Sequence, residues 1–268
     1  MKPVRGRKAK GGASPHECLS GSHSVMEAMA AGRRRLHRLF VLARCRDANC
    51  RAAADLAATI GLPVESAADD VMAKMTGTSR HQGLCLLADP LPTLDLAQAM
   101  AMLETSAGDP FVLILDQISD THNLGALLRT ALCAGVMAVI LAKDRSAGLT
   151  PTVSRVSAGA MEHLAVARVP NLAEAMRRLK ENGIWVAGLD RDQGGDIFDT
   201  SLPGPLALVV GSEGRGMRPL LKERCDYLLA IPQHGNLNSL NASVAGGVAM
   251  YEILRRRRSV SASLPPAL

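Results

Sequence analysis

The clearest pattern along the chain is a series of short apolar runs in its second half, separated by stretches with helical periodicity. Continuous apolar strands of this kind are typical of a parallel sheet whose two faces are both covered by helices. The pattern therefore predicts an α/β fold with a parallel sheet. The runs are FVLILD, MAVILA, LAVARV, IWVAGLD, LALVVG and YLLAIP, which begin at Phe111, Met137, Leu164, Ile184, Leu206 and Tyr227.

A smaller unit precedes this sheet. Helical patterns over 22–33, 47–60 and 69–75 alternate with strand patterns over 36–42, 62–65 and 83–89, which indicates a small α/β domain. A Pro-bearing stretch with one helical pattern and turn signals at both ends follows, and it is interpreted as a linker. The expected division is a basic flexible tail over 1–16, a first domain over 17–90, the linker over 91–108, a second domain over 109–258 and a flexible tail over 259–268.

Composition narrows the class of protein. The 268 residues, 47% of them hydrophobic, are enough to bury a sizeable core. No apolar stretch approaches the roughly 20 residues needed to cross a bilayer, and the basic N-terminal residues lack the apolar segment of a secretory signal. The six cysteines have no CxxC spacing, which favours reduced thiols over a disulfide framework or a zinc site. We therefore expect a soluble cytoplasmic protein that spans no membrane and binds no metal.

Basic residues are concentrated in the first 60 residues, whereas the remainder of the chain is slightly acidic. The run Arg33-Arg34-Arg35 and the nearby Arg38 add to the basic residues between 2 and 10. This distribution predicts a polyanionic partner such as a nucleic acid, met mainly by the N-terminal part. The alternative is a solvated tail with ordinary surface arginines.

Three strand ends carry polar, glycine-containing sequences, and ligands of parallel α/β sheets bind at such ends. They lie over 117–135, 212–217 and 233–241. The middle one, SEGRGM, does not follow the GxGxxG order of a dinucleotide site, and a tight turn explains its glycines equally well. The third contains His234, Asn236 and Asn238 besides Ser239 and Asn241, and so many amides can recognise a neutral planar ligand such as adenine.

Each candidate side chain also has a simpler interpretation. Asn123 can be the N-cap of the helix that starts there, and Ser239 or Asn241 can cap the last helix. Arg129 lies among leucines that belong to a core, so its side chain either reaches the surface or meets an anion. Glu213 can be a solvated turn residue. A cap requires one group, which leaves most of these side chains unexplained.

Taken in order, the three stretches resemble the motifs of the SpoU/TrmH family of RNA ribose 2′-O-methyltransferases. DTHNLGALLRTALCAG from Asp120 is similar to the first motif, VVGSEGRGM from Val209 to the second and IPQHGNLNSLNASVAGGVAMYE from Ile231 to the third. GSHSVMEAM from Gly21 is similar to the L30e-like substrate-binding domain of the ribosomal members. The resemblance covers nearly all of the chain, although Thr121 and Gln233 stand where the family often has Pro and Met.

The resemblance implies a C-terminal parallel sheet with a deep trefoil knot, which general topology rules make rare. It also implies S-adenosyl-L-methionine as the methyl donor and a homodimer formed through the C-terminal domain, with the last helix contributing. The catalytic residues carried over by motif are Asn123, Arg129, Glu213, Ser239 and Asn241. The cofactor contacts carried over are Leu189, Gly211, Ile231, Leu240 and Asn241.

An RNA target follows from the same resemblance, with a guanosine of 23S ribosomal RNA first and transfer RNA second. A guanidinium cannot serve as a base near neutral pH, so Arg129 is expected to hold the RNA phosphate beside the target ribose while phosphate or water takes the proton. The six aromatic residues are too few for an extensive base-stacking platform. A non-catalytic RNA-binding protein of the same fold is one rival. An unrelated nucleotide-using enzyme is the other, disfavoured because neither GxGxxG nor GxxxxGK[ST] occurs.

Overall fold

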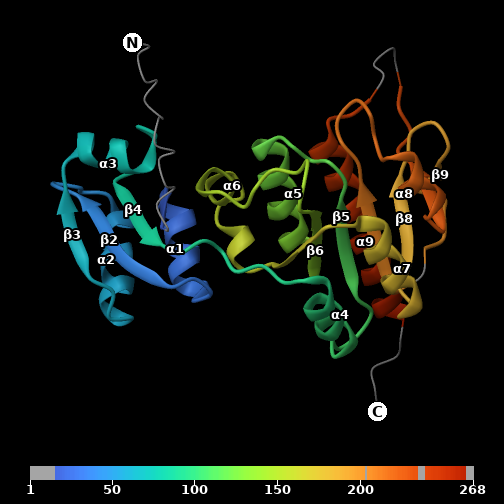
Figure 1. Cartoon of the computed structure of the whole chain (residues 1–268), viewed down its shortest axis with the longest axis horizontal. Helices are drawn as coiled ribbons and strands as arrows, with labels where there is room; N and C mark the ends of the chain where they lie inside the picture. Colours follow the sequence, from blue (N-terminus) through green and yellow to red (C-terminus); the bar gives the residue numbers. More distant parts are fainter. Residues whose placement is uncertain (1–15, 203, 235–238, 264–268) are drawn as a thin grey trace, which may run out of the picture.

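The computed structural model describes residues 16–202, 204–234 and 239–263 of the chain. These residues form two α/β units that lie next to one another and are joined by an extended connection (Figure 1). The first unit contains a four-stranded sheet and the second a seven-stranded sheet. Residues 1–15 of the expected N-terminal tail and 264–268 of the C-terminal tail lie outside the described residues.

The first domain alternates strands and helices. Its elements are β1 Glu17–Ser20, α1 Ser22–Ala31, β2 Leu36–Leu42, α2 Ala48–Thr59, β3 Val64–Ala67, α3 Asp69–Thr76 and β4 Leu84–Ala88. The strand order is β1-β4-β2-β3, in which only β2 and β3 run parallel. Leu19, Leu39 and Leu86 of the sheet pack against Val25 of α1 and Ala53 of α2 in one core. Strand β1 was not predicted, because its sequence ECLS shows neither an apolar run nor a regular alternation.

The second domain confirms the predicted parallel sheet. Its strands are β5 Phe111–Leu115, β6 Ala138–Ala142, β7 Ala165–Val169, β8 Trp185–Leu189, β9 Gly195–Asp196, β10 Leu206–Val210 and β11 Tyr227–Ala230. They are arranged in the order β7-β6-β5-β10-β8-β11-β9, and every neighbouring pair is parallel. Each residue of β5, β6 and β10 is buried, which is the burial that the continuous apolar runs predict. The two-residue strand β9 is too short to produce a sequence pattern.

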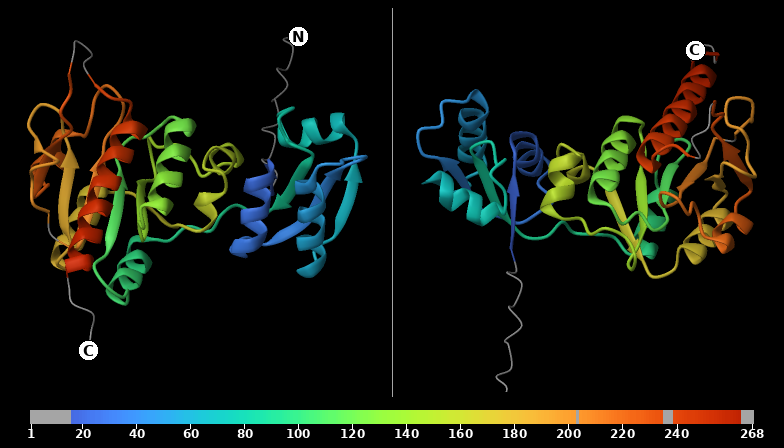
Figure 2. Two further views of the ribbon diagram at one scale, coloured as in Figure 1. Left: turned by 180° about the vertical axis from the view of Figure 1, so that it is seen from behind. Right: turned by 90° about the horizontal axis from the view of Figure 1, so that it is seen from above.

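Helices cover both faces of this sheet. They are α4 Leu96–Glu104, α5 Thr121–Cys133, α6 Pro151–Val156, the 3₁₀ helix η1 Ala160–Glu162, α7 Leu172–Glu181, α8 Pro219–Glu223 and α9 Ala242–Ser263. Helices α5 and α9 pack side by side on one face (Figure 2), and α4, α7 and α8 cover the other. Residues 259–263 were expected to be a flexible tail, but α9 includes them. No helix among the described residues combines the length and apolarity needed to span a membrane.

Polar side chains join the two domains. Arg34 is buried and donates from Nε and Nη2 to the two carboxylate oxygens of Glu162, at 2.8 and 2.9 Å. The hydroxyl groups of Ser24 and Ser154 lie 2.5 Å apart, and Arg33 donates to the backbone carbonyl of Glu162 at 3.1 Å. Burial alone would lower the pKa of Arg34, but the carboxylates of Glu162 and Glu17 together outweigh it and raise this pKa.

This joint corrects the expectation about the arginine run. Arg33 and Arg34 were predicted to face a polyanion, but both are used between the domains. Arg38 forms an ion pair with Glu65, whereas Arg35 is exposed. The charge available to an RNA is therefore smaller than the sequence indicates.

The cysteines also depart from the expectation. The structure joins Cys45 and Cys50 in a disulfide, so the prediction of six reduced thiols is wrong for this pair. Their sulfurs meet because the turn after β2 leads directly into α2, which contains Cys50. The other four cysteines are free.

Candidate active site

Three loops meet at the edge of the large sheet where the strands have their carboxyl ends. They follow β5, β10 and β11. Strands β5 and β10 are neighbours, and only β8 separates β10 from β11. Because all of these strands are parallel, segments that are far apart in sequence emerge together at this edge.

The loop after β10 is a compact turn that presents Glu213. The backbones of Ser212 and Gly216 exchange hydrogen bonds of 3.1 and 2.9 Å. Gly214 and Gly216 have positive φ angles of 82° and 65°, a conformation that favours glycine. A Cβ at Gly211 would lie 2.2 Å from the backbone carbon of Gly216. The turn itself therefore requires these glycines.

The end of this loop is anchored to β5. Asp116 directly follows β5 and is fully buried. Its carboxylate accepts hydrogen bonds from the backbone N–H of Arg218 at 3.0 Å and from Arg218 Nε at 2.9 Å. The position of the turn relative to the first of the three loops is thereby fixed.

Asn241, at the end of the third loop, has two roles. Its Oδ1 caps α9 by accepting from the backbone N–H groups of Ser243 and Val244 at 2.9 and 3.3 Å, and from the Ser243 hydroxyl at 2.6 Å. Its Nδ2 donates to Oδ1 of Asn123 at 2.9 Å and to Oε2 of Glu213 at 3.1 Å. An amide combines an acceptor with two donors, whereas an aspartate would cap the helix but could not donate.

Asn123, Glu213 and Asn241 form a closed triangle of hydrogen bonds, because Asn123 Nδ2 also donates to Glu213 Oε2, at 3.1 Å. Asn123 is not the N-cap of α5, which was the alternative considered for it. Asp120 is the cap and accepts from the backbone N–H of Asn123 at 2.8 Å. The Asn123 side chain is therefore available to reach Glu213, 90 residues further along the chain.

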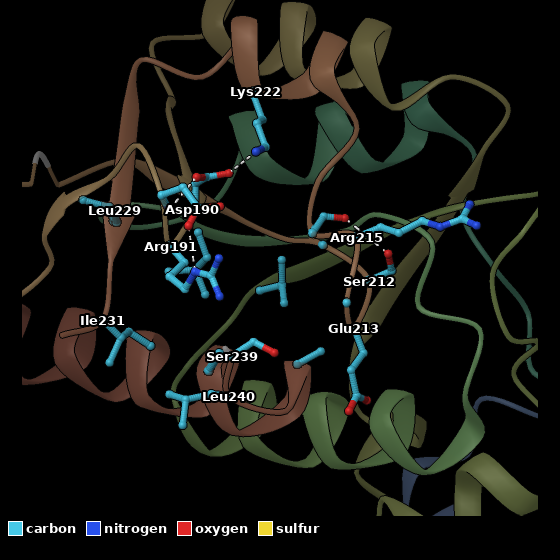
Figure 3. Close-up of a pocket in the computed structure, with 18 of the residues that line it drawn as sticks. Asp190, Arg191, Ser212, Glu213, Arg215, Lys222, Leu229, Ile231, Ser239 and Leu240 are labelled. Atoms are coloured by element: carbon cyan, nitrogen blue, oxygen red, sulfur yellow. Dashed lines mark hydrogen bonds and ion pairs between the residues drawn. The ribbon is translucent and has the colours of Figure 1, made fainter. Parts of the chain in front are cut away.

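A cavity of about 440 Å³ lies beside Glu213 of the triangle (Figure 3). Glu213 belongs both to its lining and to the triangle, and Ser239 lines it as well. Its apolar side chains come from strand ends and from the start of α9. Four of the five residues predicted to contact a cofactor line it, namely Leu189, Gly211, Ile231 and Leu240, whereas Asn241 does not.

Charged residues at the cavity were missed in the sequence. Asp190 directly follows β8 and accepts from the backbone N–H groups of Asp192 and Gln193 at 3.0 Å each. It also forms an ion pair with Lys222. Burial raises the pKa of Asp190, but the hydrogen bonds from Lys222 and the two N–H groups outweigh it and lower the pKa overall. The signal was present, since Asp190 ends the run IWVAGLD at the same edge of the sheet.

Arg129 is not brought to the triangle or to the cavity. It is exposed on α5 and forms no hydrogen bond or ion pair with any residue of the described ranges. It follows Asn123 by six residues, which turns its side chain roughly 240° around the helix axis. Of the expected amide-rich hinge, Asn236 and Asn238 lie outside the described residues, and His234 is exposed.

Comparison with known proteins extends these observations. The sequence profile of the SpoU rRNA Methylase family matches residues 110–251, and a profile described as RNA 2′-O ribose methyltransferase substrate binding matches residues 18–94. The putative TrmH family tRNA/rRNA methyltransferase YacO of Bacillus subtilis is 38% identical over 245 residues, which cover 91% of this chain and 98% of the relative. The 23S rRNA (guanosine-2′-O-)-methyltransferase RlmB of Photobacterium profundum is 39% identical over 243 residues, which cover 91% of this chain and 99% of the relative.

A similar fold is found among solved structures. The SpoU methyltransferase AviRb from Streptomyces viridochromogenes, solved in complex with AdoMet, aligns with a TM-score of 0.77 and 24% identity over 95% of both chains. At this identity the likeness shows a shared fold. Together with the profile match and the relatives that align along nearly their whole length, it identifies the chain as a member of the SpoU family of rRNA methylases.

Proposed function

We propose that this protein transfers a methyl group from S-adenosylmethionine to a ribose 2′-hydroxyl of RNA, and that its target is a guanosine of 23S ribosomal RNA. The observation that carries the proposal is the triangle of Asn123, Glu213 and Asn241 beside a cavity lined by four of the five residues expected to contact the cofactor, Leu189, Gly211, Ile231 and Leu240. The RlmB relative, which is named for that target, favours ribosomal RNA. Transfer RNA is the second candidate, because the YacO relative is named for both.

The cavity suits this cofactor. Leu189, Ile231 and Leu240 line it and offer apolar contacts to an adenine ring. The volume of about 440 Å³ falls within the range of roughly 300–1,000 Å³ that is usual for small-molecule sites. A GxGxxG loop is not needed, because this cofactor contains no pyrophosphate.

S-adenosylmethionine, when bound, supplies a methyl group that its sulfonium has already activated for transfer. The chain must then orient the ribose hydroxyl and assist the loss of its proton. Asn123 and Asn241 both donate to Oε2 of Glu213 and so fix the orientation of this carboxylate. No described residue donates to the other oxygen, Oε1, which is therefore available to the RNA. Ser239 lies on the cavity wall, where its hydroxyl can contact either reactant.

Arg129 is the residue that we expect to hold the RNA phosphate beside the target ribose. The phosphate or an ordered water then takes the proton, because a guanidinium does not act as a base at neutral pH. The exposure of Arg129 and its lack of partners within the described ranges support this role, since its donors are available to an anion.

Arg129→Ala should reduce methyl transfer by about 100-fold or more, the size expected for a residue that stabilises charge in the transition state. Cofactor affinity should stay within a few-fold, because Arg129 does not line the cavity. Single-turnover transfer and calorimetric titration measure the two quantities. Arg177→Ala, at an exposed arginine of α7 on the other face of the sheet, is the matched control. Wild-type turnover of Arg129→Ala would remove the role assigned to this residue.

Four finer features belong to the same proposal: a trefoil knot, an L30e-like first domain, a homodimer through the C-terminal domain and a cytoplasmic location. The knot is supported by the path of the chain: β10 and β11 lie on opposite sides of β8, and α9, which follows β11, returns past β8 to pack against α5 and β10. The dimer is supported by the outer face of α9. Val244 and Tyr251 are each 51% exposed there, and their spacing of seven residues puts them on one side of the helix.

The first domain is proposed to bind the RNA by phosphate contacts and by shape, so that affinity falls steeply with salt. Its match to a substrate-binding profile and the scarcity of aromatic residues in the chain support this mode.

The decisive experiment combines cofactor binding with the mapping of methylation. Calorimetric titration of the full chain with S-adenosylmethionine should give micromolar binding. Mapping of ribose methylation in ribosomal and transfer RNA, with and without the protein, should show a new 2′-O-methylguanosine in 23S RNA. Cofactor binding without transfer to any RNA would favour the non-catalytic alternative, and a lack of cofactor binding would rule out the enzyme.

A further inference from the structure

Three side chains with metal-binding groups meet at one end of the sheet of the first domain. His16 immediately precedes β1, His37 belongs to β2, and Asp89 follows β4, which lies between β1 and β2. Nδ1 of His16 and Nε2 of His37 lie 2.9 and 2.6 Å from the same atom, Oδ1 of Asp89. The three potential ligand atoms all lie within 4.8 Å of one another.

An irregularity of the sheet accounts for the position of His37. Leu36 pairs with Ala88 and Arg38 pairs with Leu87, so His37 is an additional residue inserted between two consecutive pairs of the β2–β4 ladder. A bulge of this kind interrupts regular pairing and redirects a side chain, and bulges are frequent next to functional sites. Here the bulge brings the His37 ring to within 4.2 Å of the His16 ring, measured between ring centroids.

The backbone of Asp89 is held by hydrogen bonds on both sides. The Asp89 N–H donates to the carbonyl of Arg35 at 2.9 Å, and the Asp89 carbonyl accepts from Nη1 of Arg34 at 3.2 Å. Arg34 is itself held in the buried joint with Glu162. The position of Asp89 is therefore determined before any ligand arrives, which is a requirement for a preorganised site.

We propose that His16, His37 and Asp89 bind a divalent transition-metal ion, with Zn²⁺ the best fit. Two imidazoles and one carboxylate form a ligand set that suits zinc and disfavours Mg²⁺ or Ca²⁺, which prefer oxygen ligands. Ligand atoms of a tetrahedral zinc lie about 2.0–2.2 Å from the ion and hence roughly 3.3 Å from each other. The carboxylate thus has to withdraw from each histidine by only about half an ångström or slightly more.

The site is open to solvent on one side. The side chains of His16, His37 and Asp89 are 36%, 25% and 38% exposed, so an ion can enter and keep a water as its fourth ligand. Neither the triangle nor the cavity of the second domain shares a residue with this site. The ion would tie the residue that follows the basic N-terminal stretch to β2 and to the start of the connection between the domains.

The alternative is that the two histidines only form hydrogen bonds with Asp89. Titration of the untagged, chelator-treated full chain with Zn²⁺ in a calorimeter, and with Co²⁺ followed by visible absorption, separates the two interpretations. We expect one ion per chain, micromolar or tighter affinity, and the intense visible bands of tetrahedral Co²⁺. His37→Gln and Asp89→Asn should each weaken binding about 10-fold or more.

Two control variants test whether the metal ion binds outside the proposed site. His23→Gln removes an exposed histidine of α1, and Cys133→Ser removes an exposed thiol of α5. Neither should change the affinity or the stoichiometry. Circular dichroism in the presence of chelator establishes that each variant is folded. Because His16 precedes β1, His16→Gln removes a ligand without altering a strand. A lack of binding by the wild-type chain, or undiminished binding by folded His37→Gln and His16→Gln, would overturn the proposal.

Discussion

A single amide group, that of Asn241, connects the start of α9 with the candidate active site. Its oxygen caps the helix, while its nitrogen holds both Asn123 and Glu213. An aspartate preserves the first function and removes the second, whereas an alanine removes both. The two functions can therefore be separated by substitution.

Asn241→Asp should lower methyl transfer by about 100-fold or more, because it replaces a donor to Glu213 with a second negative charge. The melting temperature should change by only a few degrees, since the cap of α9 is retained. Single-turnover transfer to 23S RNA and thermal denaturation provide the two measurements.

Ser243→Ala is the matched control for this prediction. It deletes the hydroxyl that donates to Asn241 Oδ1 but leaves the Nδ2 contacts in place, so transfer should remain within a few-fold of wild type. If Asn241→Asp transferred methyl groups at the wild-type rate, the triangle would have no part in the reaction.

For single residues, the sequence predicts which polar side chains belong to the candidate site but not which groups they contact. Asn123, Glu213 and Asn241 were singled out because they follow strand ends, and the structure brings them into contact. The choice between cap and ligand for Asn123 could not be made, because Asp120 and Asn123 are both good capping residues. Asp190 was missed although it ends a predicted strand, because a charged residue at that position is common and its partner Lys222 is not apparent in the sequence.

Helix α9 can pack closely against α5 because Gly246 has no side chain. A Cβ on Gly246 would lie 2.5 Å from Cδ2 of Leu127, which is fully buried, whereas a Cβ on Gly247 would lie 3.8 Å from its nearest neighbour, Cγ2 of Thr130. Gly246→Ala should therefore destabilise the protein by about 1–3 kcal/mol through overpacking. Gly247→Ala should be neutral or stabilising by up to about 1 kcal/mol, because alanine is the better helix former.

Urea denaturation of these two variants compares adjacent positions of one helix. The variants differ only in which face of α9 receives the methyl group. Equal stabilities would contradict the close packing of α9 on α5.

Glu252 of α9 makes the stability of this helix dependent on pH. Hydrogen bonds from Arg255 outweigh the effect of burial and, together with Arg256, lower the pKa of Glu252 from 4.5 to about 2. Because the pKa is lower in the folded state, the stabilisation is complete above about pH 4.5 and is lost as the pH falls toward 2. The free-energy difference between wild type and Glu252→Gln should thus be largest at neutral pH and should shrink below pH 4.5.

Urea midpoints measured between pH 7 and pH 3.5 check this dependence. Glu223→Gln, at an exposed glutamate in α8, is the control and should show little difference at any pH. A Glu252→Gln difference that grows on acidification would contradict the ion pairs with Arg255 and Arg256.

The elements of the second domain were predictable because both faces of its sheet are buried, so each strand appears as a continuous apolar run. The elements that were missed lack such a signal. Strand β9 has two residues, and β1 pairs with a single neighbour, β4. The bulge at His37 depends on how two distant strands align and leaves no mark in the local sequence.

At the scale of the whole molecule, the buried ion pair of Arg34 with Glu162 joins the two domains. Arg34→Ala would leave the fully buried carboxylate of Glu162 without its charged partner. Loss of one member of a buried ion pair costs about 3–5 kcal/mol, so we expect a clear decrease in melting temperature by scanning calorimetry. Arg35→Ala changes the next residue, which is exposed, and should alter stability by no more than about 0.5 kcal/mol. Similar melting temperatures for the two variants would contradict the buried joint.

The order of the strands and the joint between the domains could not be predicted from residue patterns. Both depend on contacts between residues that are far apart along the chain, such as Phe111 with Leu206 in the sheet and Arg34 with Glu162 in the joint. For the same reason the basic run was interpreted as a surface for a polyanion, or alternatively as ordinary surface arginines, and a buried joint was not considered. Only the three-dimensional structure distinguishes Arg34 from the exposed Arg35.

The buried joint has a consequence for how an RNA is chosen. The bidentate ion pair is shielded from water and therefore favours one arrangement of the first domain relative to the methyl-transfer site. We therefore expect a nucleotide to be modified efficiently only if the folded RNA places its sugar at the separation that this arrangement sets. A short oligonucleotide with the same bases cannot satisfy such a spacing and should be a poor substrate.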